Sequence, residues 1–372
     1  MIYFDNAATT FPKPSCVLRE INFCLKKYCG NPGRSSHRLS LKSSEAVYST
    51  REYIAKMLSV SNPEQVVFTY NATYALNLAI KTFITKKCHI LTSDFEHNSV
   101  VRPLERLKRE LGIEYSPFST DGDIEDNIKR EIRPETAGIV CSIASNVTGD
   151  RVSLEILSKI ATENGLFLII DASQAVGHTV INLSKTPCDV LCAPGHKALF
   201  GMAGCGFAYF KDRHRRESFI EGGSGSDSIN LNMPELLPEA YEAGTLSVPA
   251  ISSLGRGVRY VEDIGINEIR RKLFYLTEAM YERLEGIRNV RLYKYGCGVV
   301  SFNIGEVQSS SIAAKLDEYG ICVRGGLHCA PSIHRKLGTL DRGAVRISFS
   351  YLNKMRQVDK AYHAIKNIGE EL

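Results

Sequence analysis

The sequence of 372 residues has no apolar run long enough to cross a bilayer as a helix. Its start, MIYFDNAATT, lacks the basic region and apolar core of a secretory signal peptide, so none is expected. There is no block of basic residues, and 46 Lys and Arg against 41 Asp and Glu leave a net charge of only +5. These absences argue against a membrane protein, a secreted protein and a nucleic-acid-binding protein.

Eleven cysteines are present, but none of them form a C-x-x-C pair, which argues against a zinc ribbon or a thioredoxin-type motif. A chain of this length does not need disulfides to fold. We therefore expect reduced thiols, a cytoplasmic protein, and mostly small buried cysteines.

Apolar, strand-like segments alternate with amphipathic, helix-like segments between residues 65 and 210. Strands are expected at 65–70, 88–94, 113–118, 136–145, 166–174, 189–195 and 204–210. Helices are expected at 71–83, 97–111 and 153–165. This alternation predicts an α/β fold with a mostly parallel, mixed sheet, and runs such as LFLII are typical of strands covered on both faces.

A second, smaller α+β unit is predicted toward the carboxyl end. The segment 221–238 is rich in Gly, Ser, Asn and Pro and is expected to be a long loop. Further helices are expected at 266–287, 310–319 and 354–368, and strands at 299–305 and 345–352. We predict a large domain at 15–250 and a small domain formed by 1–14 and 251–372, since one hydrophobic core rarely serves so long a chain.

Ligands of parallel α/β sheets bind beyond the carboxyl ends of the strands, and several polar residues are predicted there. Asn71-Ala72-Thr73 opens a helix and suits either a phosphate or a simple N-cap. Asp171, with Gln174 after it, follows the run LFLII, where a carboxylate is costly unless it is paired. Its partner is either a protonated heterocyclic nitrogen or a capping N–H group.

The stretch CAPGHK places Lys197 just after a predicted core strand. A lysine amine there can form a Schiff base with an aldehyde if its surroundings lower its pKa; the alternative is a surface lysine. In the stretch RGGLHCA, Cys329 is either a thiolate nucleophile or a structural cysteine.

Two other groupings of the same residues are less favoured. A hydrolase dyad of Cys329 and His328 would need neighbouring side chains to face each other, which is rare. A metal site is conceivable from four histidines, but none of them have the spacing of common zinc ligands. These histidines are His37, His97, His196 and His328.

Nine motifs occur in an order that resembles a known family. They are FDNAATT, NAT-x-A-x-N, EH, SNVTG, DASQ, GHK, EAGT, R-x-G-x-HCA and VRISFS. The chain resembles the class V aminotransferases of fold type I, which use pyridoxal 5′-phosphate (PLP). Within them it is similar to the cysteine desulfurases, in particular the subgroup of SufS-type enzymes and selenocysteine lyases. The resemblance runs from residue 3 to about 353.

The resemblance implies roles around the cofactor ring. Lys197 would carry the PLP, and Asp171 would pair with the pyridinium nitrogen. His97 would stack on the ring, while Gln174 and Asn146 would lie near its phenolic oxygen and the substrate.

It also implies phosphate contacts from Ala72, Thr73 and His196. Thr245, in EAGT, would contact the phosphate of the neighbouring subunit, which implies a homodimer with shared active sites.

On the substrate side, the resemblance implies that Arg346 clamps the carboxylate of L-cysteine and that Asn6, Ala8 and His37 line the site. Cys329 would form a persulfide, releasing L-alanine and passing sulfur to an acceptor protein. Selenocysteine lysis, cysteine sulfinate desulfination and another class V reaction such as transamination stay open. So does a catalytically silent, partner-binding paralogue.

Two residues depart from the family pattern. Pro194 stands where a serine or threonine usually adds a hydroxyl to the phosphate site, and Leu327 replaces a histidine before His328. The segment after Cys329 has no long insertion, which favours a short, ordered cysteine loop and an acceptor that approaches it.

Overall fold

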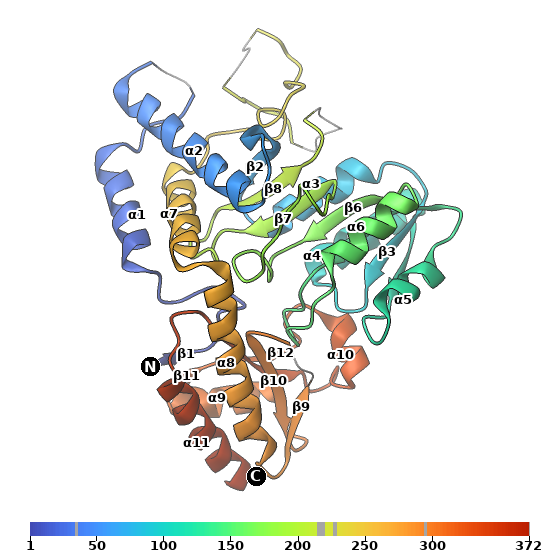
Figure 1. The fold of residues 1–372 in the computed structure, drawn as a ribbon, viewed down its shortest axis with the longest axis vertical. Helices are drawn as coiled ribbons and strands as arrows, with labels where there is room; N and C mark the ends of the chain where they lie inside the picture. The colour runs from blue at the N-terminus through green and yellow to red at the C-terminus, as the bar shows by residue number, and fades with distance from the viewer. Residues whose placement is uncertain (34–35, 214–219, 226–228, 294–295, 372) are drawn as a thin grey trace.

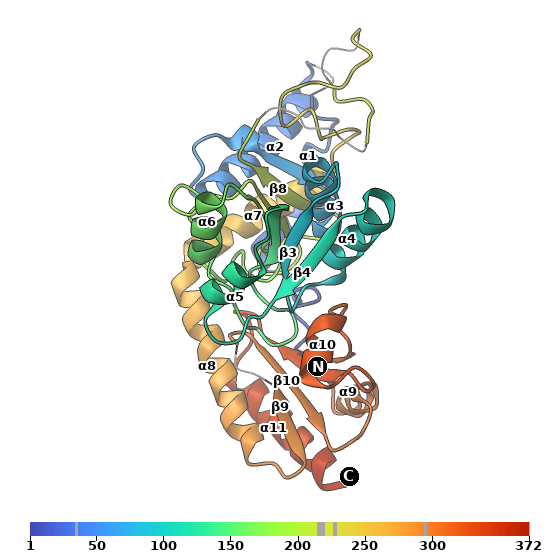
Figure 2. The ribbon, with the colours of Figure 1, turned by 90° about the vertical axis from the view of Figure 1, so that its right-hand side faces the viewer.

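The computed structural model describes residues 1–33, 36–213, 220–225, 229–293 and 296–371. A large α/β unit and a smaller unit lie end to end, and one long helix, α8 (Ile266–Glu285), runs along the side of the smaller one (Figures 1 and 2). No helix in the described part of the chain is long and apolar enough to cross a membrane.

A seven-stranded sheet in the order β2-β8-β7-β6-β5-β3-β4 forms the centre of the large unit. Only β8 runs antiparallel to its neighbours, so the predicted mostly parallel, mixed sheet is confirmed. The strands are β2 (Val66–Thr69), β3 (His89–Ser93), β4 (Glu114–Phe118), β5 (Thr136–Ser142), β6 (Phe167–Asp171), β7 (Val190–Pro194) and β8 (Gly206–Phe210).

Helices cover both faces of this sheet, as the apolar central strands such as β6 and β7 require. In Figure 2, α3 and α4 lie on one side of the sheet and α5 and α6 on the other. Around this unit the helices are α1 (Ser15–Lys27), α2 (Arg38–Met57), α3 (Ala72–Phe83), α4 (Asn98–Leu111), α5 (Ile124–Glu131), α6 (Leu154–Glu163) and α7 (Val248–Ile264), with a 3-10 turn at Pro63–Gln65. One buried apolar cluster fills the space between the sheet and α3 and α4, and a larger one extends over the other face into the small unit.

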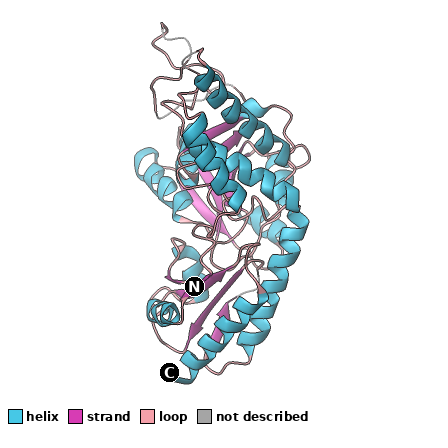
Figure 3. Cartoon of the chain, turned by 90° about the vertical axis from the view of Figure 1, so that its left-hand side faces the viewer, coloured by secondary structure: helices cyan, strands magenta, loops and turns pink. Residues whose placement is uncertain are grey.

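The smaller unit is built on an antiparallel sheet in the order β12-β13-β10-β9, which helices cover (Figure 3). Its elements are β9 (Val290–Tyr293), β10 (Val299–Ile304), β11 (Ile321–Cys322), β12 (Arg324–Gly326), β13 (Ala344–Ser348), α8, α9 (Ser309–Glu318), α10 (Pro331–Leu337) and α11 (Met355–Glu371). The strand expected to reach residue 352 ends at Ser348. The amino terminus joins this unit, because β1 (Ile2–Tyr3) pairs with β11.

We propose the division into two domains, with one adjustment. The predicted boundary at residue 250 falls inside α7, which packs on α1 and α2 of the large unit. Gly265, with φ +87, ends α7 before α8 begins. A boundary at Gly265 therefore keeps α7 in the large unit, with the helices that it packs against.

A buried ion pair ties α2 to the segment before α7, and it predicts a large effect on stability. Arg51 Nη2 lies 2.5 Å from Glu242 Oε2, and Glu242 Oε1 accepts the Phe68 N–H at 2.6 Å. We expect Glu242→Ala to lower the free energy of unfolding by about 3–5 kcal/mol, because it leaves Arg51 charged and buried.

Urea unfolding followed by circular dichroism measures this effect. The matched control is Glu262→Ala, which breaks the exposed pair with Lys56 and should cost less than about 1 kcal/mol. Equal losses in the two variants would contradict the prediction.

Candidate active site

The loops that follow β2, β3, β5, β6 and β7 meet at one edge of the large sheet and line a cavity of about 110 Å³. Eight of the residues singled out from the sequence line it. They are Ala72, Thr73, His97, Asn146, Asp171, Gln174, His196 and Lys197.

Asp171 places a nearly buried carboxylate in this cavity. It is 4% exposed, and its Oδ1 accepts the Ser173 N–H at 2.8 Å. Among the described residues its carboxylate has no other hydrogen bond and no ion pair. Since a buried carboxylate is costly without a cationic partner, the site suits a positively charged group that the chain itself does not supply.

Lys197 follows β7 and enters the same cavity. Its carbonyl accepts the Thr10 hydroxyl at 2.8 Å, which anchors the loop to the amino-terminal segment. Burial lowers the pKa of Lys197 to about 8, although the nearby Asp171 carboxylate acts in the opposite direction. A substantial neutral fraction near neutral pH makes this amine a nucleophile.

The lowered pKa predicts how the apoprotein captures PLP. Below pH 8 the capture rate should rise about tenfold per pH unit with the neutral fraction of Lys197, and above it should level off. Stopped-flow absorbance measures the rate. The same reaction with N-acetyl-lysine, divided by the neutral fraction of that amine at each pH, corrects for titration of PLP itself. A corrected rate that keeps rising through pH 10 would contradict the lowered pKa.

The amino end of α3 offers free N–H groups to the cavity. Asn71 caps the helix through its side chain, which accepts the Tyr74 N–H at 2.9 Å, and its carbonyl accepts the Ala75 N–H. The N–H groups of Ala72 and Thr73 have no helical partner and suit a phosphate. Pro194 also lines this cavity and brings no hydroxyl.

His97 is held as a neutral ring at the start of α4. Its Nδ1 accepts the Ser99 N–H at 3.1 Å, which leaves the proton on Nε2. Burial lowers the pKa of His97. The negative charge of Asp171 raises this pKa, and the positive charge of Lys197 lowers it further.

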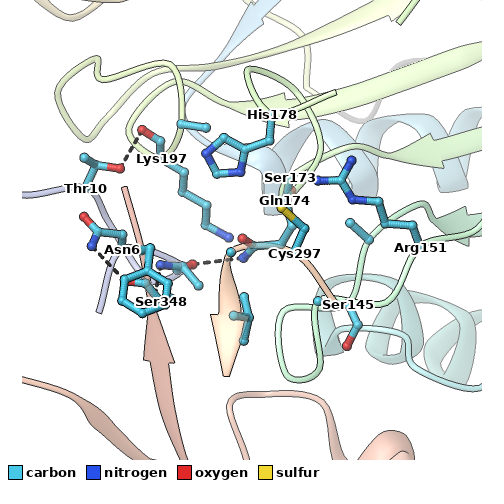
Figure 4. A pocket seen from close by; sticks show the side chains of 17 residues that line it. Asn6, Thr10, Ser145, Arg151, Ser173, Gln174, His178, Lys197, Cys297 and Ser348 are labelled. Carbon is cyan, nitrogen blue, oxygen red and sulfur yellow. Dashed lines mark hydrogen bonds between the residues drawn. The ribbon is translucent and has the colours of Figure 1, made fainter. Parts of the chain in front are cut away.

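A second, smaller cavity of about 20 Å³ adjoins the first and shares Gln174 and Lys197 with it. Figure 4 shows the Lys197 side chain extending into this cavity toward Gln174. Asn6 also lines it, but its amide is already bonded to the Ser348 carbonyl at 2.8 Å. Ala8 lies in the adjacent turn and lines neither cavity.

Arg346 lies on β13 and is 1% exposed. It contacts Asp5 at 2.5 Å and donates to the Asn146 carbonyl at 3.0 Å. Its buried Nε has no hydrogen-bond partner among the described residues. The guanidinium is thus fixed next to the cavity residue Asn146, although Arg346 itself lines neither cavity.

Cys329 is exposed and sits in a strained backbone turn beside the cavity. His328 and Cys329 have φ of 51° and 58°, in the left-handed region. Their carbonyls accept from the Asn146 side chain at 2.8 Å and the Asn98 N–H at 2.7 Å. Arg324 Nη2 lies 3.9 Å from the Cys329 sulfur, so a positive charge is near the thiol.

Thr245 and His37 are not part of this site within one chain. Thr245 is exposed and lines a separate depression, together with Asn31 and Pro32 of the loop that precedes α2. His37 is also exposed and caps α2, its Nδ1 accepting the Ser40 N–H at 3.2 Å.

The two less favoured groupings gain no support. The buried His328 ring donates from Nε2 to the Ala344 carbonyl at 3.0 Å and so is engaged away from the Cys329 thiol. No cluster of three metal-ligating side chains occurs among the residues that the structure describes.

Sequence reasoning missed two acidic residues of the site. Asp5 pairs with Arg346. Glu96, the residue before His97, is buried and accepts hydrogen bonds from Ser93 and Ser142, and burial raises its pKa to about 7. Both stand in motifs that the sequence displays, FDNAATT and EH, so the signal was present but no role had been attached to it.

A lysine with a lowered pKa and a buried carboxylate without a cationic partner share one cavity beside a helix amino terminus, and these are the features of a PLP-dependent enzyme of fold type I. The chain belongs to the class V aminotransferase family, whose model matches residues 2–361. PLP is the cofactor of this family, and the residues present fit it: a carboxylate for the ring nitrogen, an amine for the aldehyde and free N–H groups for the phosphate.

Curated relatives agree with this assignment. The chain is 31% identical to a probable cysteine desulfurase of Pyrococcus abyssi, with 100% of this chain and 95% of that protein covered. It is 30% identical to a probable cysteine desulfurase of Methanothermobacter thermautotrophicus, over 99% of this chain and 94% of that one.

Solved structures match the fold over the whole chain. The apo cysteine desulfurase of Thermococcus onnurineus NA1 superposes with a TM-score of 0.93 at 30% identity, covering 100% of this chain and 95% of that one. The cysteine desulfurase CsdA of Escherichia coli gives 0.91 at 23% identity, over 100% and 95% of the two chains, and so shows the fold alone.

Proposed function

We propose that the protein is a PLP-dependent cysteine desulfurase that converts L-cysteine to L-alanine and keeps the sulfur as a persulfide on Cys329. One observation carries the proposal. The Lys197 amine and the free Asp171 carboxylate share a cavity, and an exposed cysteine is held beside it by Asn98 and Asn146.

The chain's own residues bind the cofactor and move a proton. The Asp171 carboxylate would hold the protonated ring nitrogen of PLP, and His97 would hold the ring. Ala72, Thr73 and His196 would hold the phosphate. When bound, PLP supplies an electron sink for the charge that develops at the substrate α-carbon. The Lys197 amine accepts the α-proton and later returns a proton.

Arg346 and Asn146 orient the substrate in this proposal. The unused Nε of Arg346 is a donor for the substrate carboxylate, and Asp5 fixes the guanidinium in place. The Asn146 side chain holds the His328 carbonyl and so joins the substrate site to the cysteine turn.

Sulfur transfer then follows from the position of Cys329. Its thiolate attacks the substrate sulfur, and an S–S bond forms as the bond between that sulfur and the β-carbon breaks. The bonding electrons stay with carbon, which takes up a proton as alanine is released. Arg324 places a positive charge beside the attacking sulfur.

The partners proposed are a second copy of the chain and a sulfur-acceptor protein, in the cytoplasm. Thr245 and His37 are exposed and remote from the chain's own cavity, which suits a role at the site of a neighbouring subunit. The cysteine turn is short, so the acceptor has to approach it.

The test is incubation with L-cysteine and a thiol reductant, with alanine and sulfide measured together. We expect the two products in a one-to-one ratio. Pyruvate or another keto acid in place of alanine would contradict desulfuration. Parallel rates on selenocysteine and cysteine sulfinate decide whether either is a better substrate than cysteine.

A further inference from the structure

The carbonyl oxygen of His196 accepts two hydrogen bonds from the amino-terminal segment. It accepts the Lys13 ammonium at 2.7 Å and the Thr10 N–H at 3.2 Å. These two donors occupy both lone pairs of the oxygen. A third donor, the Thr9 hydroxyl, lies farther from it, at 3.3 Å.

The Thr9 hydroxyl has a better acceptor in the imidazole of the same histidine. Its Oγ1 lies 3.0 Å from His196 Nδ1. A hydroxyl carries one proton, so it can donate either to the ring or to the carbonyl. Because Lys13 and Thr10 already fill the carbonyl, the proton goes to Nδ1.

This hydrogen bond decides which nitrogen of His196 carries the ring proton. Burial, together with the positive charges of Lys197 and Lys13, lowers the pKa of His196 to about 4, so the ring is neutral. When Nδ1 accepts from Thr9, the single proton sits on Nε2. The other tautomer would place its hydrogen toward Thr9 and leave only a lone pair on Nε2.

His196 lines the cavity together with Ala72, Thr73 and Pro194. A phosphate group accepts hydrogen bonds, so only an Nε2–H group is a useful neighbour for it. Pro194 contributes neither a hydroxyl nor an N–H at this end of the cavity. The N–H groups of α3 and the ring of His196 therefore carry more of the phosphate binding.

We propose that Thr9 is a positioning residue for the cofactor phosphate: it fixes His196 in the Nε2–H tautomer. Lys13 assists it by occupying the His196 carbonyl. This extends the site to Thr9 and Lys13, which line neither cavity.

Binding of two cofactor forms to the apoprotein tests the proposal. We expect Thr9→Val to weaken PLP binding by about tenfold or more, the effect of losing a hydrogen bond to a charged group. Pyridoxal, which lacks the phosphate, should bind Thr9→Val and wild type within about twofold. Thr9→Ser keeps the hydroxyl and should restore PLP binding.

Two results of this experiment would overturn the proposal. One is unchanged PLP affinity in Thr9→Val. The other is an equal loss for PLP and pyridoxal, which would mean that Thr9 only supports the Lys197 loop. No L-cysteine substrate is added in these measurements, so their outcome does not depend on the proposed desulfurase activity.

Nitrogen-15 NMR of histidine in the apoprotein reads the tautomer directly, with the His196 signal identified by its loss in His196→Gln. Wild type should show the proton on Nε2. Thr9→Val should show a mixture, and so should Lys13→Met, in which the Thr9 hydroxyl is free to turn to the carbonyl. A wild-type ring protonated on Nδ1 would refute the assignment.

Discussion

Lys197→Ala is expected to abolish turnover and the yellow colour of bound PLP. The side chain that would bind the aldehyde carbon and the group that would move the α-proton are the same amine. Its loss should lower the rate of alanine formation by at least about 10⁴-fold. Absorbance spectra and an alanine assay after incubation with excess PLP measure the two effects.

The control for this variant is Lys211→Ala, which removes an exposed lysine just after β8. It should keep both the colour and the rate. A Lys197→Ala protein that retained PLP through dialysis and still formed alanine would show that another amine binds the cofactor.

Cys329→Ala is expected to separate cofactor binding from sulfur release. Cys329 lines neither cavity, so the variant should take up PLP as wild type does. Without a thiolate to attack the substrate sulfur, sulfide release from L-cysteine should fall at least about 10²-fold, the loss expected when a positioned nucleophile is removed. Selenocysteine should be less affected, because selenium leaves more easily without attack.

Cys29→Ser is the matched control, since Cys29 and Cys329 are both exposed free thiols. It should release sulfide at the wild-type rate. Normal desulfuration by Cys329→Ala would mean that another residue accepts the sulfur, or that none is needed.

The central sheet was predictable because most of its strands are mainly apolar and alternate along the chain with helices. Helix α7 was missed because Gly255 and Gly257 weaken its helical pattern. The structure shows why they are there: a Cβ at Gly257 would meet the carbonyl of Leu199, just after Lys197, and one at Gly255 would meet Thr50. The need for glycine at these two positions comes from contacts with residues far away in the sequence, so the local sequence does not show it.

The cavity residues were predictable for a related reason. Each follows a strand of the parallel sheet, so their convergence depends on topology alone. The pair of Asp5 and Arg346, and the contacts of Thr9 and Lys13 with His196, join segments far apart in the chain. No local pattern in the sequence predicts which of these partners meet.

Lys197 is expected to be the residue that binds PLP opposite Asp171. Borohydride reduction of the yellow protein, followed by peptide mass mapping, tests this directly because it fixes the cofactor to the amine that holds it. The prediction is a single modified peptide containing Lys197, at one cofactor per chain. A colourless protein that takes up no PLP, or a label on any other lysine, would contradict the account.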